Sequence, residues 1–239
     1  LCGTTTELVG AVSALAREAL RRIDLRGHDG VHPRLGVVDV VPFYPVRGAS
    51  MADAVSAANL CASRLWDELG LPVFLYEEAA TRPEARALPS VRKLAFGGLA
   101  PDFGGPGPHP TAGAAVVGAR GLLVAYNVDL DTDDIGAART VAAAIRGRYP
   151  GRVRSLGLFL PSRGIAQVSM NILDPDHTCL EAVFSAVESM AAEAGISVRD
   201  SEIVGVVPRA CLCAADQGAL KLRDQPKVLE DFVDRLFAV

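Results

Sequence analysis

The residues best suited to chemistry lie in one short segment, in which His32 is followed by Pro33, Arg34 and Asp39. Imidazole gains and loses a proton near neutral pH, so a histidine at the end of a loop is a common general acid or base. A carboxylate such as Asp39 can orient the second ring nitrogen. A purely structural histidine at the entry to a strand explains the same pattern, so the segment by itself leaves both roles open for His32.

Metal binding is another use for these histidines, and their spacing disfavours it. His28 and His32 stand four residues apart, which on a helix presents two ligands on one face. Gly30 and Pro33 break a helix there, so we predict no metal site. His109 lies between two prolines, which restrict the backbone on either side of it; this is typical of a functional side chain held in place, or of an exposed turn.

The segment from residue 77 to residue 113 has no sustained periodicity apart from a short helix predicted near residues 89–95. So long an irregular stretch inside a compact chain is usually disordered or functional, and we interpret it as a binding loop. The glycines at 104, 105 and 107 match neither the dinucleotide-binding spacing nor the P-loop spacing. A nucleotide-phosphate site is therefore not predicted.

Hydrophobic periodicity and capping residues define the elements that position these side chains in the first half of the chain. Thr4 and Glu7 have capping-box spacing at the start of one helical pattern, and Ser50 precedes a second pattern that Gly70 ends. The predicted elements are a helix at 4–24, a strand at 37–46, a helix at 50–69 and a strand at 72–76. This is the order of a βαββαβ unit without its opening strand, so we expect a strand before Leu1 to be missing.

The second half has the complete order of that unit. The predicted elements are a strand at 122–130, a helix from Thr132 to residue 146, strands at 153–160 and 165–173, a helix from Asp176 to residue 194, a strand at 202–207 and a C-terminal helix at 228–237. In the ferredoxin-like arrangement both helices cover one face of an antiparallel sheet. We therefore predict an α+β chain of two ferredoxin-like subdomains, 1–113 and 114–239.

The amino-acid composition disfavours some classes of binding partner. Half of the 239 residues are hydrophobic and the net charge is −4, which is typical of a globular protein and disfavours nucleic acid or an anionic membrane as a partner. No apolar run reaches the roughly 18 residues of a membrane helix, and no signal peptide is visible at the start. The five cysteines lack metal-site spacing, so we expect buried thiols and a cytoplasmic location.

The run from His32 to Gly48, which reads His-Pro-Arg-Leu-Gly-Val-Val-Asp-Val-Val-Pro-Phe-Tyr-Pro-Val-Arg-Gly, resembles the signature of the glutamate formiminotransferases. These form the amino-terminal domain of the bifunctional formiminotransferase-cyclodeaminases. Further stretches agree in the same order, at residues 100–104, 118–120, 123–128, 166–171 and 204–208. The resemblance therefore extends over essentially the whole chain.

The resemblance implies a transferase that moves the formimino group of N-formimino-L-glutamate to N5 of tetrahydrofolate, the co-substrate, in histidine breakdown and one-carbon metabolism. It also implies two subdomains packed around a substrate groove, a homodimer and a catalytic histidine at His32, and no metal is required. The folate-contacting positions that it implies are Asp102, Gly104, Gly105, His109, Thr111, Gly113, Arg120 and Arg139, with Arg146 near the last. Arg34, Asp39 and Arg47 are the expected substrate-binding residues.

Two alternatives remain open, the first because upstream strands that line the groove in the family are expected to be missing here, and the second because folate binding could be retained while the glutamate pocket changes. One is a truncated, weakly catalytic homologue that still binds folate. The other is a one-carbon or amidine transferase that acts on a different substrate.

Overall fold

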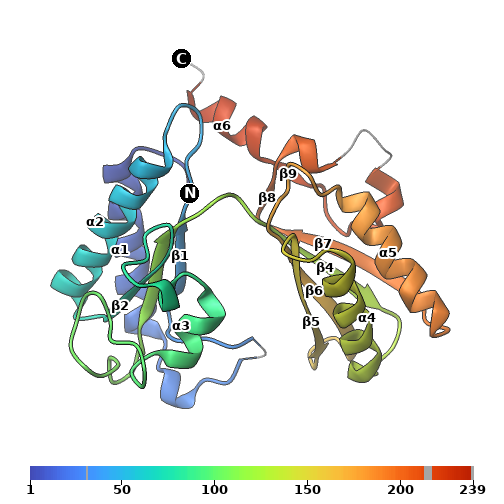
Figure 1. Cartoon of the computed structure of the whole chain (residues 1–239), viewed down its shortest axis with the longest axis horizontal. Coiled ribbons are helices and arrows are strands. Elements are labelled where there is room, and N and C mark those ends of the chain that lie inside the picture. Colours follow the sequence, from blue (N-terminus) through green and yellow to red (C-terminus); the bar gives the residue numbers. More distant parts are fainter. Residues whose placement is uncertain (31, 213–216, 238–239) are drawn as a thin grey trace. The chain divides into compact units, whose positions relative to one another are not determined.

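The computed structural model describes residues 1–30, 32–212 and 217–237 and divides the chain into two compact units, Leu1–Arg120 and Gly121–Val239 (Figure 1). The first unit includes a strand, β3 (Ala115–Ala119), that the sequence patterns do not predict. The division follows this strand, whereas the division drawn from the sequence precedes it. Helices and strands together confirm the α+β class.

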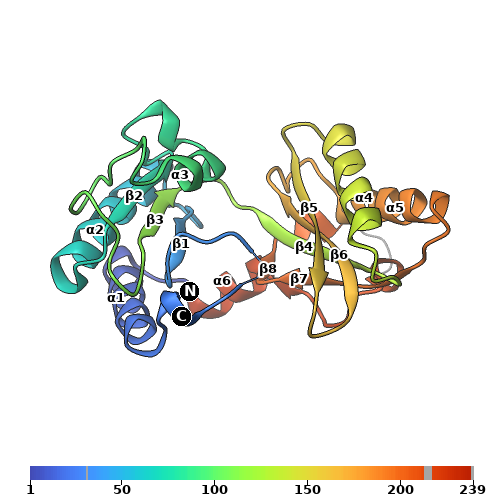
Figure 2. The same cartoon turned by 90° about the horizontal axis from the view of Figure 1, so that it is seen from below.

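The first unit is built on a parallel three-stranded sheet in the order β1-β3-β2. Its elements are α1 (Thr5–Arg22), the 3₁₀ turn η1 (Leu25–Gly27), β1 (Asp39–Phe43), α2 (Met51–Leu69), β2 (Val73–Glu77), the 3₁₀ turn η2 (Pro83–Ala85), α3 (Leu88–Leu94) and β3. Because side chains alternate across a strand, Val73 and Leu75 share a core with α1 and α2, while Phe74 and Tyr76 share another with α3. The helices therefore cover both faces of this sheet (Figure 2).

Local capping signals explain where the first two long helices begin and end. Thr4 and Glu7 form a capping box on α1, and Ser50 forms another with Asp53 on α2. Gly70 ends α2 in the left-handed conformation, at a φ of 60°. These predicted boundaries are confirmed to within a residue or two.

The second unit has the complete β-α-β-β-α-β order. Its elements are β4 (Val124–Leu130), α4 (Ile135–Arg148), β5 (Val153–Leu160), β6 (Ile165–Ile172), α5 (Leu180–Glu193), β7 (Val198–Val204), β8 (Val206–Val207), the 3₁₀ turns η3 (Arg209–Leu212) and η4 (Gln217–Leu220), β9 (Lys227–Val228) and α6 (Leu229–Phe237). The main sheet is antiparallel in the order β5-β6-β4-β7. Alternate β4 side chains, such as Tyr126 and Val128, share a core with α4 and α5, so the ferredoxin-like arrangement is confirmed here.

The helix starts of the second unit differ from the prediction. Asp134, not Thr132, is the N-cap of α4, and the Thr132 hydroxyl instead accepts a hydrogen bond from the amide of Asp134 at 3.1 Å. Cys179, not Asp176, is the N-cap of α5. Each of these turns contains more than one polar residue able to cap, so packing of the helix on the sheet decides which residue lies at the start.

The cysteines follow the prediction in part. Cys2, Cys61 and Cys211 are free, and burial raises the pKa of the Cys61 and Cys211 thiols to about 12. The prediction of free thiols is wrong for Cys179, which is disulfide-bonded. Cys213 lies outside the described residues. No helix in the described part of the chain has the length and apolar character needed to cross a membrane.

Packing of α4 on β5 predicts a sharp contrast between two glycines. A β-carbon at Gly157 would lie 2.6 Å from the Cα of Arg139, whereas one at Gly147 would meet nothing within 4 Å. We expect Gly157→Ala to lower the free energy of unfolding by about 1–3 kcal/mol, because helix and strand must separate. Gly147→Ala, the control, should be neutral or stabilise the helix by up to about 1 kcal/mol. Equal thermal unfolding midpoints for the two variants would contradict this packing.

Candidate functional site

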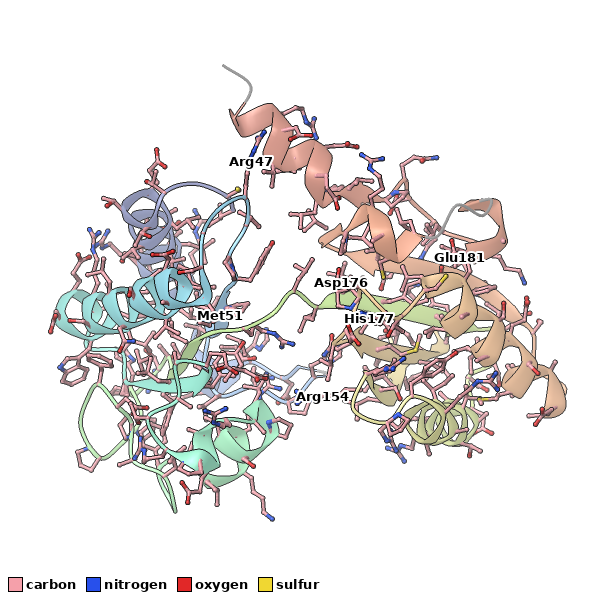
Figure 3. All side chains as sticks on the ribbon, turned by 45° about the horizontal axis from the view of Figure 1, so that its top comes forward. Arg47, Met51, Arg154, Asp176, His177 and Glu181 are labelled. Carbon is pink, nitrogen blue, oxygen red and sulfur yellow. The ribbon has the colours of Figure 1, made fainter. Side chains whose placement is uncertain are left out.

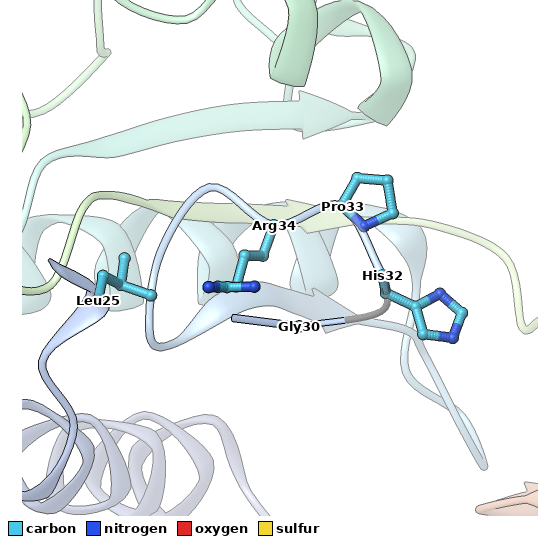
Figure 4. Close-up of a pocket in the computed structure, with 5 residues that line it drawn as sticks. All are labelled: Leu25, Gly30, His32, Pro33 and Arg34. Atoms are coloured by element: carbon cyan, nitrogen blue, oxygen red, sulfur yellow. The ribbon is translucent and has the colours of Figure 1, made fainter. Parts of the chain in front are cut away.

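The proposed catalytic histidine lies at the rim of a pocket in the first unit. His32, Pro33 and Arg34 line a cavity of about 440 Å³ together with Leu25 and Gly30 (Figure 4). His32 is exposed, while Arg34 is half-buried. In Figure 4 the guanidinium of Arg34 lies between Leu25 and His32, close to Gly30, and the imidazole of His32 projects away from it. The pocket thus presents an accessible imidazole near a fixed positive charge.

Arg34 is held by the loop that it belongs to. Its terminal Nη2 donates a hydrogen bond to the carbonyl oxygen of His28. In the described part of the chain its buried Nε has no hydrogen-bond partner. A buried donor without a partner is unfavourable, and a guanidinium binds carboxylates through two parallel N–H donors. Arg34 therefore keeps one unsatisfied, buried N–H donor at this pocket among the described residues.

Backbone hydrogen bonds join the His32 segment to the end of the irregular loop. The pairs are Leu25 N to Thr111 O at 2.8 Å, Val37 N to Ala112 O at 3.0 Å and Ala114 N to Leu35 O at 3.2 Å. Gly36 and Gly113 also form an isolated antiparallel bridge. Two sequence regions that were singled out separately are therefore neighbours in space.

Two glycines make this close approach feasible. Gly113 has a φ of 70°, and a β-carbon on it would lie 3.0 Å from the Cα of Gly36. A β-carbon on Gly36 would lie 2.7 Å from the carbonyl oxygen of Ala112. Backbone atoms cannot move aside as a flexible side chain can, so larger residues are excluded at both positions.

His109 folds the tip of the same loop. Its Nδ1 accepts hydrogen bonds from the amides of Thr111, at 3.3 Å, and Ala112, at 3.1 Å. Its own backbone exchanges two hydrogen bonds with Gly113, of 2.8 and 3.0 Å. Because Nδ1 is an acceptor, the ring proton of the neutral form is on Nε2. One ring nitrogen is thus used inside the loop.

Asp102 anchors the irregular segment just before its glycine-rich part. Its Oδ2 accepts from the amide of Leu75 at 2.8 Å, and its Oδ1 accepts from the hydroxyl of Thr81 and lies 3.1 Å from Arg82. The side chain is only 8% exposed. The neighbouring Gly104 has a φ of 123° and packs on Pro72, whereas Gly105 is open. Asp102 therefore fixes the loop on β2, and a folate contact by it stays a prediction.

Asp39 also uses both carboxylate oxygens within the first unit. Oδ1 accepts from the amide of Leu35 at 2.7 Å, and Oδ2 accepts from Nη2 of Arg92 at 2.6 Å. Arg92 was not predicted as part of the site, and no local sequence signal identifies it, since 53 residues separate it from Asp39. Substrate binding by Asp39 stays a prediction.

The remaining predicted arginines lie elsewhere. Arg47 follows the carboxyl end of β1, and the amide of Arg120 donates to Phe43 at 3.0 Å at that same end. The His32 segment lies before the amino end of β1, so the strand separates the two groups by about 15 Å. Arg139 is exposed on α4 of the second unit. The structure thus brings His32, Arg34, Thr111 and Gly113 together, and not Arg47 or Arg120.

The pocket combines an exposed imidazole with a guanidinium, two groups that together could move a proton beside a bound anion. Among the residues that the structure describes, no group of three or more His, Cys, Asp or Glu side chains is placed to hold a metal ion. The chain matches the family models of the formiminotransferase domain, N-terminal subdomain, over residues 1–120, and of the formiminotransferase domain over residues 125–231. This protein therefore belongs to the formiminotransferase family.

Individual relatives agree with that assignment. The glutamate formimidoyltransferase of Streptococcus pyogenes serotype M1 is 39% identical over 235 residues, which cover 94% of this chain and 79% of the relative. The glutamate formimidoyltransferase of Thermoplasma acidophilum is 36% identical over 241 residues, which cover 95% of this chain and 79% of the relative. The formimidoyltransferase-cyclodeaminase of Rattus norvegicus is 41% identical over 223 residues, covering 86% of this chain but only 41% of that longer protein.

The internal hydrogen bonds of His109 lead to a stability prediction. We expect His109→Ala to lower the free energy of unfolding by about 1–3 kcal/mol, because the amides of Thr111 and Ala112 lose their acceptor. His109→Asn should recover part of the loss, since its side-chain oxygen can accept from a nearby backbone amide. Thermal unfolding measures both.

The matched control for His109 is His177→Ala. His177 is exposed in the turn before α5, and its ion-pair partner among the described residues is Asp174, so its loss should leave the unfolding midpoint almost unchanged (Figure 3). Equal midpoints for the His109 and His177 variants would show that His109 does not hold the loop.

Proposed function

We propose that this protein transfers the formimino group of N-formimino-L-glutamate to N5 of tetrahydrofolate, giving 5-formiminotetrahydrofolate and glutamate. The observation that carries the proposal is the match to formimidoyltransferases along almost the whole chain, with His32 exposed at a pocket. Tetrahydrofolate enters as a co-substrate. A homodimeric state and a cytoplasmic location stay predictions.

His32 is the proposed general acid and base. The reaction forms a bond between the formimino carbon and N5 and breaks the bond between that carbon and the glutamate nitrogen. The attacking nitrogen loses a proton and the leaving nitrogen gains one. A neutral imidazole can accept the first proton and return it to the leaving group, so one residue serves both half-steps. The exposure of His32 leaves its ring accessible to both substrates.

Arg34 is the proposed anchor for a substrate carboxylate. Its partnerless Nε–H fits such a group, because a carboxylate would satisfy a buried donor and neutralise the guanidinium. The cavity of about 440 Å³ is large enough for an amino-acid-sized ligand. Arg47 is proposed to contact the substrates from the opposite end of β1.

The irregular loop is the proposed folate-contacting segment. Its proposed contacts are Asp102, Gly104, Gly105, His109, Thr111 and Gly113, with Arg120 and Arg139 for the glutamyl carboxylates. The loop is tied to the His32 segment through Gly36 and Gly113, which supports its placement beside the reacting groups. Its exposed glycines and prolines offer backbone rather than bulky side chains to a flat ring system.

We expect His32→Ala to lower kcat for formimino transfer by about 10²–10⁴-fold, because general acid–base catalysis contributes that much. The KM values should change little, since the imidazole does not anchor either substrate. Steady-state assays at saturating tetrahydrofolate measure this. The control is His177→Ala, which should retain wild-type kcat.

Two outcomes would overturn the assignment of His32 or the activity itself. Wild-type kcat in His32→Ala would show that another group moves the proton. Tight calorimetric binding of tetrahydrofolate without turnover by the wild-type protein would instead identify a folate-binding homologue.

Arg34 should affect substrate binding rather than chemistry. We expect Arg34→Met to raise the KM for formiminoglutamate by at least tenfold while kcat falls less, because a lost carboxylate contact weakens ground state and transition state alike. Arg148→Met, at an exposed position near the end of α4, is the control and should change neither constant. An unchanged KM in Arg34→Met would place the carboxylate elsewhere.

A further inference from the structure

We propose that Asp39 and Arg92 form a clamp that positions the His32 loop, acting as positioning residues that touch neither substrate. The inference rests on the proposed function for the role of His32, but its geometry is independent of it. Asp39 was expected to contact substrate, or to orient the imidazole directly. Its carboxylate oxygens instead accept hydrogen bonds from the amide of Leu35 and from the guanidinium of Arg92.

The clamp acts on the backbone close to His32. The amide of Leu35, three residues after His32, donates to Asp39 Oδ1 at 2.7 Å. Pro33 restricts the intervening chain by fixing its own φ. Displacement of Leu35 is therefore transmitted to His32 through a short and stiff segment.

Leu35 is held on three sides. Its carbonyl accepts from the amide of Ala114 at 3.2 Å, on the side of β3. Its side chain packs against the core cluster that contains Val91 of α3. Its amide donates to Asp39, and the Oδ2 of Asp39 lies 2.6 Å from Nη2 of Arg92 on α3. Helix α3 thus holds this point both by apolar packing and through an ion pair.

The backbone at Asp39 indicates that the carboxylate is needed there. Asp39 has a φ of 54°, a left-handed conformation that glycine or asparagine adopts more readily. Arg92 in turn leaves its buried Nε without a hydrogen-bond partner among the described residues. Both features are unfavourable by themselves, so the interaction between the two side chains must offset them. The pair is only about a quarter exposed, at 26% and 27%, so water screens it incompletely.

Hydrogen exchange tests the clamp without any assay of activity. We expect the amide of Leu35 to exchange at least tenfold faster in Asp39→Gly than in wild type, because the amide loses its acceptor while the backbone keeps a conformation that glycine adopts freely. Asp39→Asn retains an acceptor oxygen and should stay close to wild type. Unchanged exchange at Leu35 in a folded Asp39→Gly would overturn the clamp.

Kinetics test whether the clamp positions His32. We expect Arg92→Met to lower kcat three- to tenfold with unchanged KM values and to broaden or split the NMR signals of the His32 ring, since the ring loses a single orientation. Arg92→Lys should restore part of kcat. Lys93→Met is the control, because Lys93 is the exposed next residue of α3.

The outcomes separate this inference from the proposed function. A wild-type protein without transferase activity would remove the proposed function, while the Leu35 exchange rates and the His32 signals would still decide the clamp. Unchanged His32 signals and kcat in Arg92→Met would overturn the positioning role even in an active enzyme. A KM increase in place of the kcat decrease would show that the pair binds substrate instead.

Discussion

The close backbone contact between Gly36 and Gly113 is the constraint on which the first unit depends. It lies directly before the parallel pairing of β1 with β3, in which Asp39 is opposite Ala115. The segments that lead into β1 and β3 can approach each other this closely only if neither Gly36 nor Gly113 carries a β-carbon. The same contact places the His32 segment against the turn built by His109. Sheet formation and assembly of the pocket are therefore consequences of one steric requirement.

Arginine–carboxylate pairs hold the polar parts of both units in the same way. Asp39 and Asp102 bind backbone amides with one oxygen and face an arginine with the other. In the second unit the fully buried Asp129 accepts from Gln167 at 2.8 Å and lies 3.3 Å from Arg223. A buried carboxylate is costly unless its hydrogen bonds are satisfied. These aspartates meet that condition, which is why they can fix loops to strands.

The features that sequence reasoning predicted depend on short-range interactions. The capping box at Thr4, the N-cap at Ser50 and the glycine that ends α2 all act over a few residues, so local sequence predicts them. Strand β3 was missed because all five of its residues are buried and it reads as a short apolar run without alternation. The pairing of Asp39 with Arg92 was missed because only the tertiary fold brings them together.

Resemblance to a family locates a site but does not divide its residues by role. The run from His32 to Gly48 contains a pocket-lining histidine and arginine, a glycine required by backbone contact and an aspartate used internally. All of them contribute to a recognisable signature, because the loss of any one would disturb the same pocket. These residues differ in whether the polar atoms of their side chains already have hydrogen-bond partners within the protein. Among the described residues, His32 is exposed and the Nε of Arg34 has no hydrogen-bond partner, whereas both oxygens of Asp39 and of Asp102 have protein partners. This difference supports the proposal that His32 and Arg34 act on the substrates while Asp39 holds the loop.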